Sequence, residues 1–133
     1  MIKKIEPFVG NVLAIEIIDG YTESDEKLAR KLFQEKIDEG FDHVHLLVRL
    51  DELKLNKSNV KAFMEDTIVT FREFEKIGNI AIVAHSNILK TLIAIDSFFF
   101  ERLKKGFEER YFDTSQMDEA LAFVSSKQPQ ENT

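Results

Sequence analysis

The chain has 133 residues, a formal net charge of -6, 44 % hydrophobic and 32 % charged residues, and no cysteine. This composition is typical of an ordinary globular domain that is long enough to bury a core. Without cysteine, disulfides, thiolate nucleophiles and cysteine-ligated zinc are excluded, and an acidic chain with no run of Lys and Arg disfavours nucleic acid as a partner.

The sequence shows no membrane-spanning or export signal. Met1 to Pro7 contains two lysines, but no apolar segment follows them, and no stretch approaches the roughly 20 apolar residues of a membrane span. We therefore expect a cytoplasmic protein, with a peripheral membrane position as a further alternative.

The first 20 residues predict two strands, Ile2 to Phe8 and Val12 to Asp19. The short turn Val9-Gly10-Asn11 between them predicts an antiparallel hairpin. In the second strand one face is fully apolar, with Leu13, Ile15 and Ile17, and the other is mixed.

A helix follows Gly20. Thr22 to Asp25 resembles a capping box, in which the Thr22 hydroxyl and the Asp25 carboxylate satisfy each other's backbone N–H groups. The helix is predicted to stop at Gly40. One stripe at helical spacing faces inward: Leu28, Ala29, Leu32, Phe33 and Ile37.

His43 to Leu50 predicts a third strand, whose even-numbered residues are all apolar. This alternation indicates that one face is buried more deeply, so we expect helices mainly on one side of the sheet. His43 and His45 lie on the other face. A two-histidine metal site is an alternative there, but His85 would be about 20 Å away at ~3.3 Å per residue. We favour surface histidines and expect no metal and no cofactor.

A second helix is predicted after a polar loop, with Ser58 as its cap, an end near Phe74 and Gly78 closing it. All five glycines are expected at element boundaries. Its inward residues are Val60, Phe63, Met64, Ile68 and Phe71.

Asn79 to Phe107 predicts a buried strand, Ile80 to Ala84, then a turn at His85 and Ser86, then a long helix. The helix carries two adjacent apolar stripes, which together are wider than one sheet face covers. A neighbouring helix, a subunit, a bound apolar ligand or a membrane surface must cover the remainder. The stripes are Ile88, Leu92, Ile95, Phe99 and Leu103, and Leu89, Ile93 and Phe100.

The last elements are a short strand, Glu109 to Phe112, and a helix capped by Ser115 with Asp118. Met117, Ala120, Leu121 and Val124 are its inward residues. The fold is thus α/β in the order β-β-α-β-α-β-α-β-α, with a mixed, mostly parallel sheet. We expect one domain over residues 1–124 and an irregular tail over 125–133.

Catalytic signals are weak. His85 and Ser86 follow a parallel strand, where α/β domains place their sites, but spacing names no partner acid and a helix cap explains Ser86 equally well. Sequence-adjacent carboxylates diverge in space. GxGxxG and GxxxxGK[ST] motifs are absent. We assign no catalytic residue and keep a small hydrolase as a third hypothesis.

Four segments between about Asn11 and Val124 together carry a family resemblance: Val12 to Gly20 with Thr22 to Asp25, His45 to Asp51, Ile80 to Val83, and the ending Arg110-Tyr111-Phe112 with Glu119 to Phe123. They resemble the SpoIIAA-like proteins, relatives of the STAS domains of bacterial anti-sigma-factor antagonists and anion transporters. The chain departs from the family in having no Trp, with Phe123 where the last one is expected. Leu55 to Asn59 replaces the phosphorylatable Asp-Ser-Ser-Gly turn of the antagonists.

The resemblance implies a STAS-like, non-enzymatic domain that holds apolar ligands between sheet and helices and associates with membranes through mobile helices. This agrees with the wide apolar arc. The residues predicted to bind an apolar or lipid-like ligand are Phe63, Met64, Ile68, Phe71, Leu89, Leu92 and Ile93.

Three consecutive phenylalanines followed by basic residues predict a membrane-contact segment. An equally strong alternative is that these phenylalanine rings complete the hydrophobic core where the helix meets the final strand. The segment comprises Phe98, Phe99, Phe100, Arg102, Lys104 and Lys105.

The alternative function is a regulatory protein-interaction domain of the anti-sigma-antagonist type, switched by phosphate at Ser58. A homodimer that seals the apolar arc is a further alternative.

Overall fold

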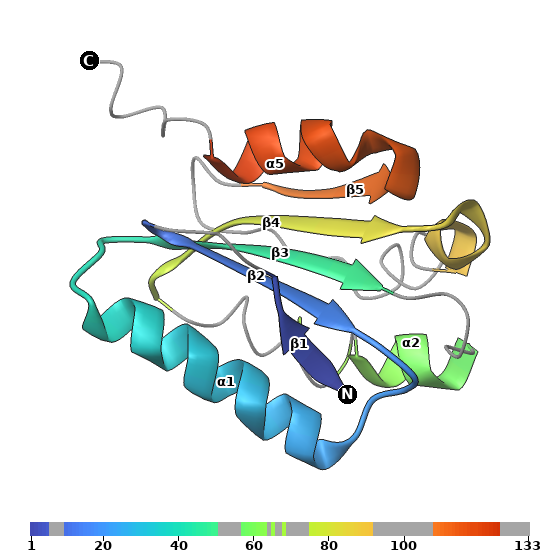
Figure 1. Cartoon of the computed structure of the whole chain (residues 1–133), viewed down its shortest axis with the longest axis horizontal. Helices are drawn as coiled ribbons and strands as arrows, with labels where there is room; N and C mark the ends of the chain where they lie inside the picture. The colour runs from blue at the N-terminus through green and yellow to red at the C-terminus, as the bar shows by residue number, and fades with distance from the viewer. Residues whose placement is uncertain are drawn as a thin grey trace.

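Within the described residues, five strands form one sheet in the order β1-β2-β3-β4-β5 in the computed structural model of the chain (Figure 1). The structure describes residues 1–5, 10–50, 57–63, 65, 68, 75–91 and 108–125. The strands are β1 (Ile2–Lys4), β2 (Val12–Ile17), β3 (Val44–Leu50), β4 (Ile77–Ala84) and β5 (Glu109–Asp113).

The sheet is mixed and mostly parallel. β1 pairs antiparallel with β2, in the register Ile2 to Ile17, and β2 through β5 run parallel. The hairpin and the mostly parallel sheet confirm the prediction, although β1 and β2 are shorter than the predicted strands. The turn uses Gly10 at φ +73°, a backbone conformation open to glycine at little steric cost.

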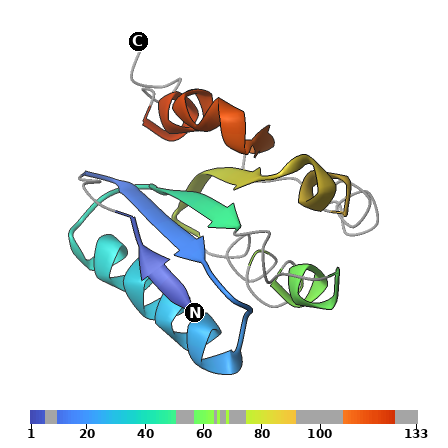
Figure 2. The same ribbon diagram turned by 45° about the vertical axis from the view of Figure 1, so that its right-hand side comes forward.

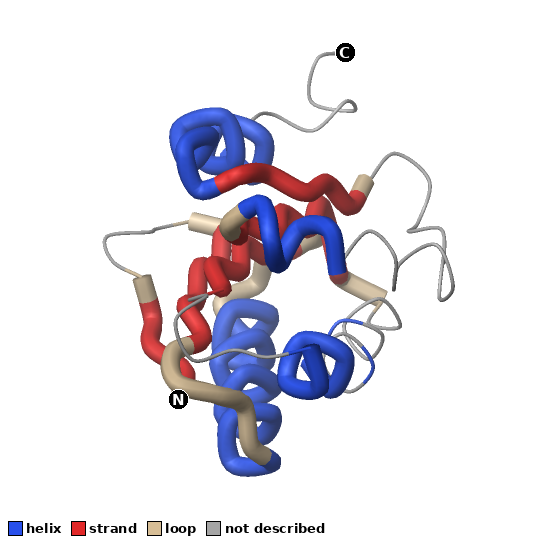
Figure 3. Tube along the Cα trace, turned by 90° about the vertical axis from the view of Figure 1, so that its right-hand side faces the viewer, coloured by secondary structure: helices blue, strands red, loops and turns tan. Residues whose placement is uncertain are grey.

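The helices lie on both sides of this sheet. They are α1 (Glu23–Asp38), α2 (Lys57–Phe63), a helical segment over residues 86–91 and α5 (Met117–Ser125), which follows a 3₁₀ turn, η2 (Thr114–Gln116). α1 and α2 cover one face, and α5 covers the other (Figures 2 and 3). The predicted element order and the predominance of helices on one face are therefore confirmed.

The larger of two hydrophobic cores, here called the first core, lies on the face covered by α1 and α2. It gathers alternate residues of the strands, as period-2 side-chain alternation requires. Its buried members are Ile2, Leu13, Ile15, Ile17, Ala29, Phe33, Val44, Leu46, Val48, Leu50, Val60, Phe63, Ile68, Ile77, Ile80, Ile82, Ala84 and Ile88.

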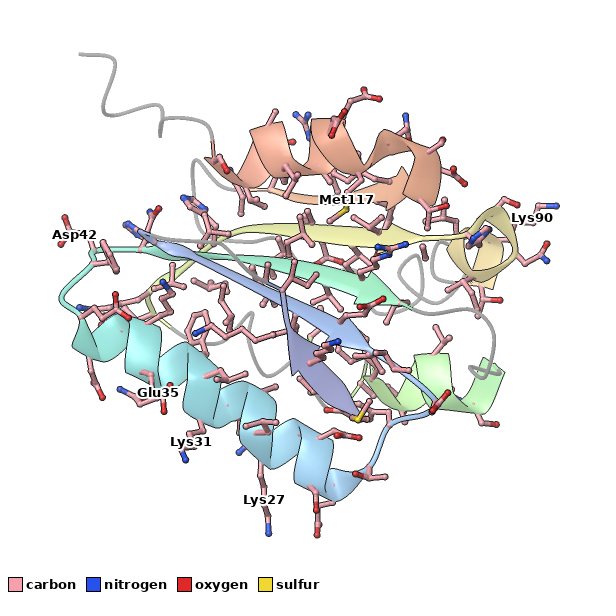
Figure 4. The ribbon with its side chains drawn as sticks, in the orientation of Figure 1. Lys27, Lys31, Glu35, Asp42, Lys90 and Met117 are labelled. Carbon is pink, nitrogen blue, oxygen red and sulfur yellow. The ribbon has the colours of Figure 1, made fainter. Side chains whose placement is uncertain are left out.

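The second core lies between the sheet and α5. Met117 points from α5 toward the sheet in Figure 4 and packs against this core with Leu121, as predicted for the last helix. The buried members are Val12, Ala14, Leu47, Ala81, Val83, Ala120 and Val124.

α1 begins with the predicted capping box. The Thr22 N–H donates to Asp25 Oδ2 at 2.9 Å, and the Asp25 N–H donates to the Thr22 hydroxyl at 3.3 Å. The α-amino group of Met1 lies 3.2 Å from the same carboxylate. Leu28 was predicted to face inward, but it is 39 % exposed. The buried face of the helix includes Ala29 and Phe33. On its opposite face, Lys27, Lys31 and Glu35 point to solvent (Figure 4).

Three predicted caps are shifted along the chain. α2 begins at Lys57, so Ser58 lies inside its first turn. The Leu89 N–H donates to the His85 carbonyl at 2.8 Å, which makes His85 the residue before the helix and Ser86 its first residue. Asp113 with Gln116, and not Ser115 with Asp118, forms the capping box before α5.

The environment of His45 also differs from the prediction. His45 is fully buried, and its Nδ1 accepts a 2.8 Å hydrogen bond from the Asn79 N–H. The expectation of a surface histidine was wrong because α5 packs against this face of β3 and β4. Gly78 does not close a helix. It lies inside β4, where a Cβ would stand 2.5 Å from His45 Nδ1.

Gly78→Ala should therefore destabilise the protein by about 1–3 kcal/mol through overpacking. Because the clash is with the His45 ring, the same substitution should cost clearly less in a His45→Ala background. Urea unfolding of the four proteins of this double-mutant cycle measures the coupling. If Gly78→Ala destabilises both backgrounds equally, the His45 ring is not the reason why position 78 requires glycine.

Asp25→Asn should weaken the start of α1 by about 1 kcal/mol at pH 7. Burial raises the pKa of Asp25, but hydrogen bonds from Thr22 and the α-amino group outweigh it and place the pKa below 3.8. The carboxylate therefore stabilises the fold above about pH 3.8, and this contribution disappears as pH falls through the folded-state pKa.

The difference between wild type and Asp25→Asn should accordingly shrink from pH 7 to pH 2.5 in urea unfolding. Asp42→Asn, at an exposed position, is the matched control and should behave like wild type. A difference that stays constant with pH would contradict the assignment.

Candidate functional site

The first core brings together three of the seven residues predicted to bind an apolar ligand. Phe63, at the end of α2, is 1 % exposed, and Ile68 is fully buried. Leu89, in the helical segment 86–91, is partly buried and packs against the same core. Two segments that flank β4 in sequence thus converge on one apolar layer.

α2 reaches this layer because Val60 and Phe63 lie three residues apart and share one helix face. Val60 is 1 % exposed, whereas Lys61 between them is exposed. This amphipathic spacing is the sequence signal that placed Phe63 inward.

Tyr21 adds an aromatic side chain that the sequence analysis missed. It lies edge-on to Phe63, with ring centroids 5.5 Å apart at 83°, and packs against the first core. Such edge-to-face pairs contribute about 0.5–1.5 kcal/mol beyond their burial. Tyr21 stands between Gly20, at φ +124°, and the cap Thr22. An aromatic residue directly before a helix cap was the available signal.

The helical segment 86–91 starts where β4 ends. Ile88 is 8 % exposed and belongs to the first core, and Lys90 points to solvent (Figure 4). The segment therefore turns its apolar side chains toward the layer beside α2.

The chemistry of this layer is that of hydrophobic burial. The first core consists of hydrophobic side chains, and α1, which covers this face, also buries Asp25 and Lys36. At its margin, the partly buried Tyr111 donates its hydroxyl proton to Glu109 at 2.9 Å. Among the described residues, this layer therefore offers hydrophobic contacts, with the Tyr111 hydroxyl at its margin.

The other predicted ligand residues, Met64, Phe71, Leu92 and Ile93, lie outside the described residues. The predicted membrane-contact residues also lie outside them: Phe98, Phe99, Phe100, Arg102, Lys104 and Lys105. Ser58 is described, and it is exposed in the first turn of α2.

The structure supplies an acid near His85 that spacing could not identify. Register pairs Ala84 with Asp113, which places Asp113 beside His85 and Ser86 at the carboxyl end of the sheet. The Asp113 carboxylate accepts from the Ser115 hydroxyl at 2.7 Å and the Ser115 N–H at 2.8 Å. These bonds, aided by His85, lower the pKa of Asp113. Asp113 therefore works as a helix cap.

Neither a metal cluster nor a membrane span is found in the part of the chain that the structure describes. No three or more His, Asp or Glu side chains gather there as ion ligands. None of its helices has the length and apolar character needed to cross a bilayer.

A family model described as SpoIIAA-like matches residues 12–125. The chain belongs to the SpoIIAA-like family. The match runs from β2 to the end of α5, so it includes the first core, apart from Ile2, and all buried members of the second core. No curated protein and no solved structure gives a significant match.

Membership supports a regulatory domain of the STAS or anti-sigma-factor-antagonist type. SpoIIAA-like STAS domains are generally non-enzymatic, and STAS-family domains typically interact with proteins.

Proposed function

We propose that this SpoIIAA-like domain is a non-enzymatic regulatory module that binds an apolar, lipid-like ligand between the sheet and its helices. The observation that carries the proposal is the convergence of Phe63, Ile68 and Leu89 on one hydrophobic layer, the first core. α2 and the segment 86–91 would form the two helical walls, and the Tyr111 hydroxyl would provide a polar atom at the margin.

The physical basis is burial of methylene groups, worth about 0.8 kcal/mol each before the costs of binding. Leu89 is the most informative wall residue because it is only partly buried, so its side chain contacts the core and still presents surface to a ligand. Phe98 to Lys105 would add peripheral contact with an anionic bilayer, aromatic rings at the acyl boundary and cations at the headgroups.

Leu89→Asn should weaken binding of a fluorescent fatty acid such as parinaric acid at least about tenfold. A polar amide at the wall costs more than 1 kcal/mol when it is desolvated without a partner. Leu28→Asn is the matched control, since Leu28 is a helical leucine that is already 39 % exposed. It should bind the probe as wild type does.

Both variants must show wild-type circular dichroism for the comparison to count. If Leu89→Asn binds the fluorescent fatty acid as tightly as wild type, the ligand site lies elsewhere or does not exist. Native mass spectrometry of protein purified without detergent gives an independent readout. A co-purifying mass that extracts into organic solvent supports the proposal, whereas a clean ligand-free dimer assigns the apolar surface to self-association.

The second candidate is a protein-interaction domain regulated by phosphate at Ser58. The observation that favours it is the exposure of Ser58 in the first turn of α2. A phosphate there would lie among amide groups that the helix leaves unpaired, where negative charge is stabilised.

Ser58→Asp should change the set of proteins captured from a cell extract, as identified by mass spectrometry. Ser24→Asp is a closely matched control, because Ser24 is also exposed and is also the second residue of its helix. If wild type, Ser58→Asp and Ser24→Asp capture the same proteins, regulation by phosphate at Ser58 is ruled out. A change shared by both variants would show an effect of added charge alone.

A further inference from the structure

A chain of hydrogen bonds joins β3, β4 and β5 near their amino ends. The Asn79 N–H donates to His45 Nδ1 at 2.8 Å, and the Asn79 side-chain oxygen accepts from the Glu108 N–H at 3.0 Å. The Ile80 N–H then donates to the Glu108 carbonyl at 2.9 Å. Through Asn79, the buried imidazole is thus connected to the residue at which the chain enters β5.

The hydrogen bond fixes the protonation state of the ring. A backbone N–H can only donate, so His45 Nδ1 must be the unprotonated nitrogen, and the ring is neutral with its proton on Nε2. The ring also has little room to rotate away. Its Nδ1 and Cε1 lie 2.5 Å and 2.7 Å from the point that a Cβ on Gly78 would occupy, and the residue is fully buried.

We propose that His45 is a proton-sensitive latch that anchors the start of β5 to the centre of the sheet. A proton on Nδ1 would set an N–H against the Asn79 N–H and place a positive charge in a fully buried position. Both effects disfavour the closed arrangement. Uptake of the proton therefore requires the ring to leave the Asn79 N–H. Asn79 is then no longer held from β3, and its side chain ceases to support the Glu108 N–H.

β4 itself carries no charged residue. On β5, Glu109 accepts from the Tyr111 hydroxyl at 2.9 Å, and Asp113 accepts from the Ser115 N–H at 2.8 Å. The Lys76 ammonium, just before β4, donates to the Phe41 carbonyl at 3.4 Å. Glu108 and Arg110 pair with each other at 2.9 Å, and Arg110 also lies over the Phe123 ring at 4.8 Å.

Other charged and titratable groups lie on the elements packed around His45. Asp118 and Glu119 are exposed in the first turn of α5, which starts at the carboxyl end of β5 and runs back along the sheet (Figure 1). Glu16 and Arg49 pair at 3.8 Å near the carboxyl ends of β2 and β3. His43 shares the face of β3 with His45, two residues earlier and partly buried.

The direction of the pH effect follows from linkage. In the unlatched state, a histidine is half-protonated near pH 6.5. Since the latched ring excludes the proton, the latch is fully stable above that pH and is lost progressively below it. From pH 7.5 to pH 5, the equilibrium between latched and unlatched states should shift about thirtyfold toward the unlatched state.

Amide hydrogen exchange by NMR tests the latch. Protection factors, corrected for intrinsic rates, should fall about thirtyfold at Asn79 and Glu108 between pH 7.5 and pH 5. The Leu47 amide, inside β3, should fall much less. His45→Gln should remove the pH dependence, because an amide oxygen can accept the same N–H without titrating. His43→Gln is the control and should keep it.

Two results would overturn the proposal. One is a pH dependence that is the same in wild type and His45→Gln. The other comes from ¹⁵N shifts of the imidazole in wild-type protein, which require no variant to fold. A ring that becomes protonated near pH 6.5 while Asn79 and Glu108 stay protected would show that protonation does not open the latch.

Discussion

The constraint on which the structure depends is the burial of β4 along its whole length. All eight residues from Ile77 to Ala84 are buried, so this strand needs a cover on both faces of the sheet. A parallel strand between two others has this requirement because its side chains alternate between faces and its backbone is paired at both edges. α1, α2 and the segment 86–91 cover one side, and α5 covers the other.

Topology decides which helix covers which face. β2 to β5 follow one another in sequence and in space, so each crossover moves one strand along in the same direction. Crossovers of one hand that move in one direction place their helices on one face. α5 follows β5 and leads to no further described strand. It is therefore free of this restriction and can pack on the opposite face.

Hydrophobic periodicity predicted most of this arrangement, because alternation along β2 and β3 reports directly which residues share a face. It could not predict the environment of His45. The cover over that residue comes from α5, more than 70 positions later, and a polar residue on a mixed face looks the same whether that face is open or covered. Gly78 was misplaced for the same reason, since its role is to leave room for a ring on another strand.

The caps show a second kind of limit. Asp113 and Ser115 are both good capping residues, and which of them caps the helix depends on where β5 ends. For the candidate ligand site, helical spacing predicted that Phe63 and Ile68 face inward. It gave no indication that Tyr21 would meet Phe63, because that contact joins the β2–α1 turn to a helix some 40 residues later.

The two cores also differ in when they can form during synthesis. Every buried member of the first core lies between Ile2 and Ile88, whereas the second core requires Ala120 and Val124. A nascent chain can therefore close the α1 side of its sheet while Leu47, Ala81 and Val83 still face water. Chaperones bind apolar surface of this kind on incomplete chains. Synthesis of α5 thus ends the interval in which this apolar face of the sheet promotes aggregation.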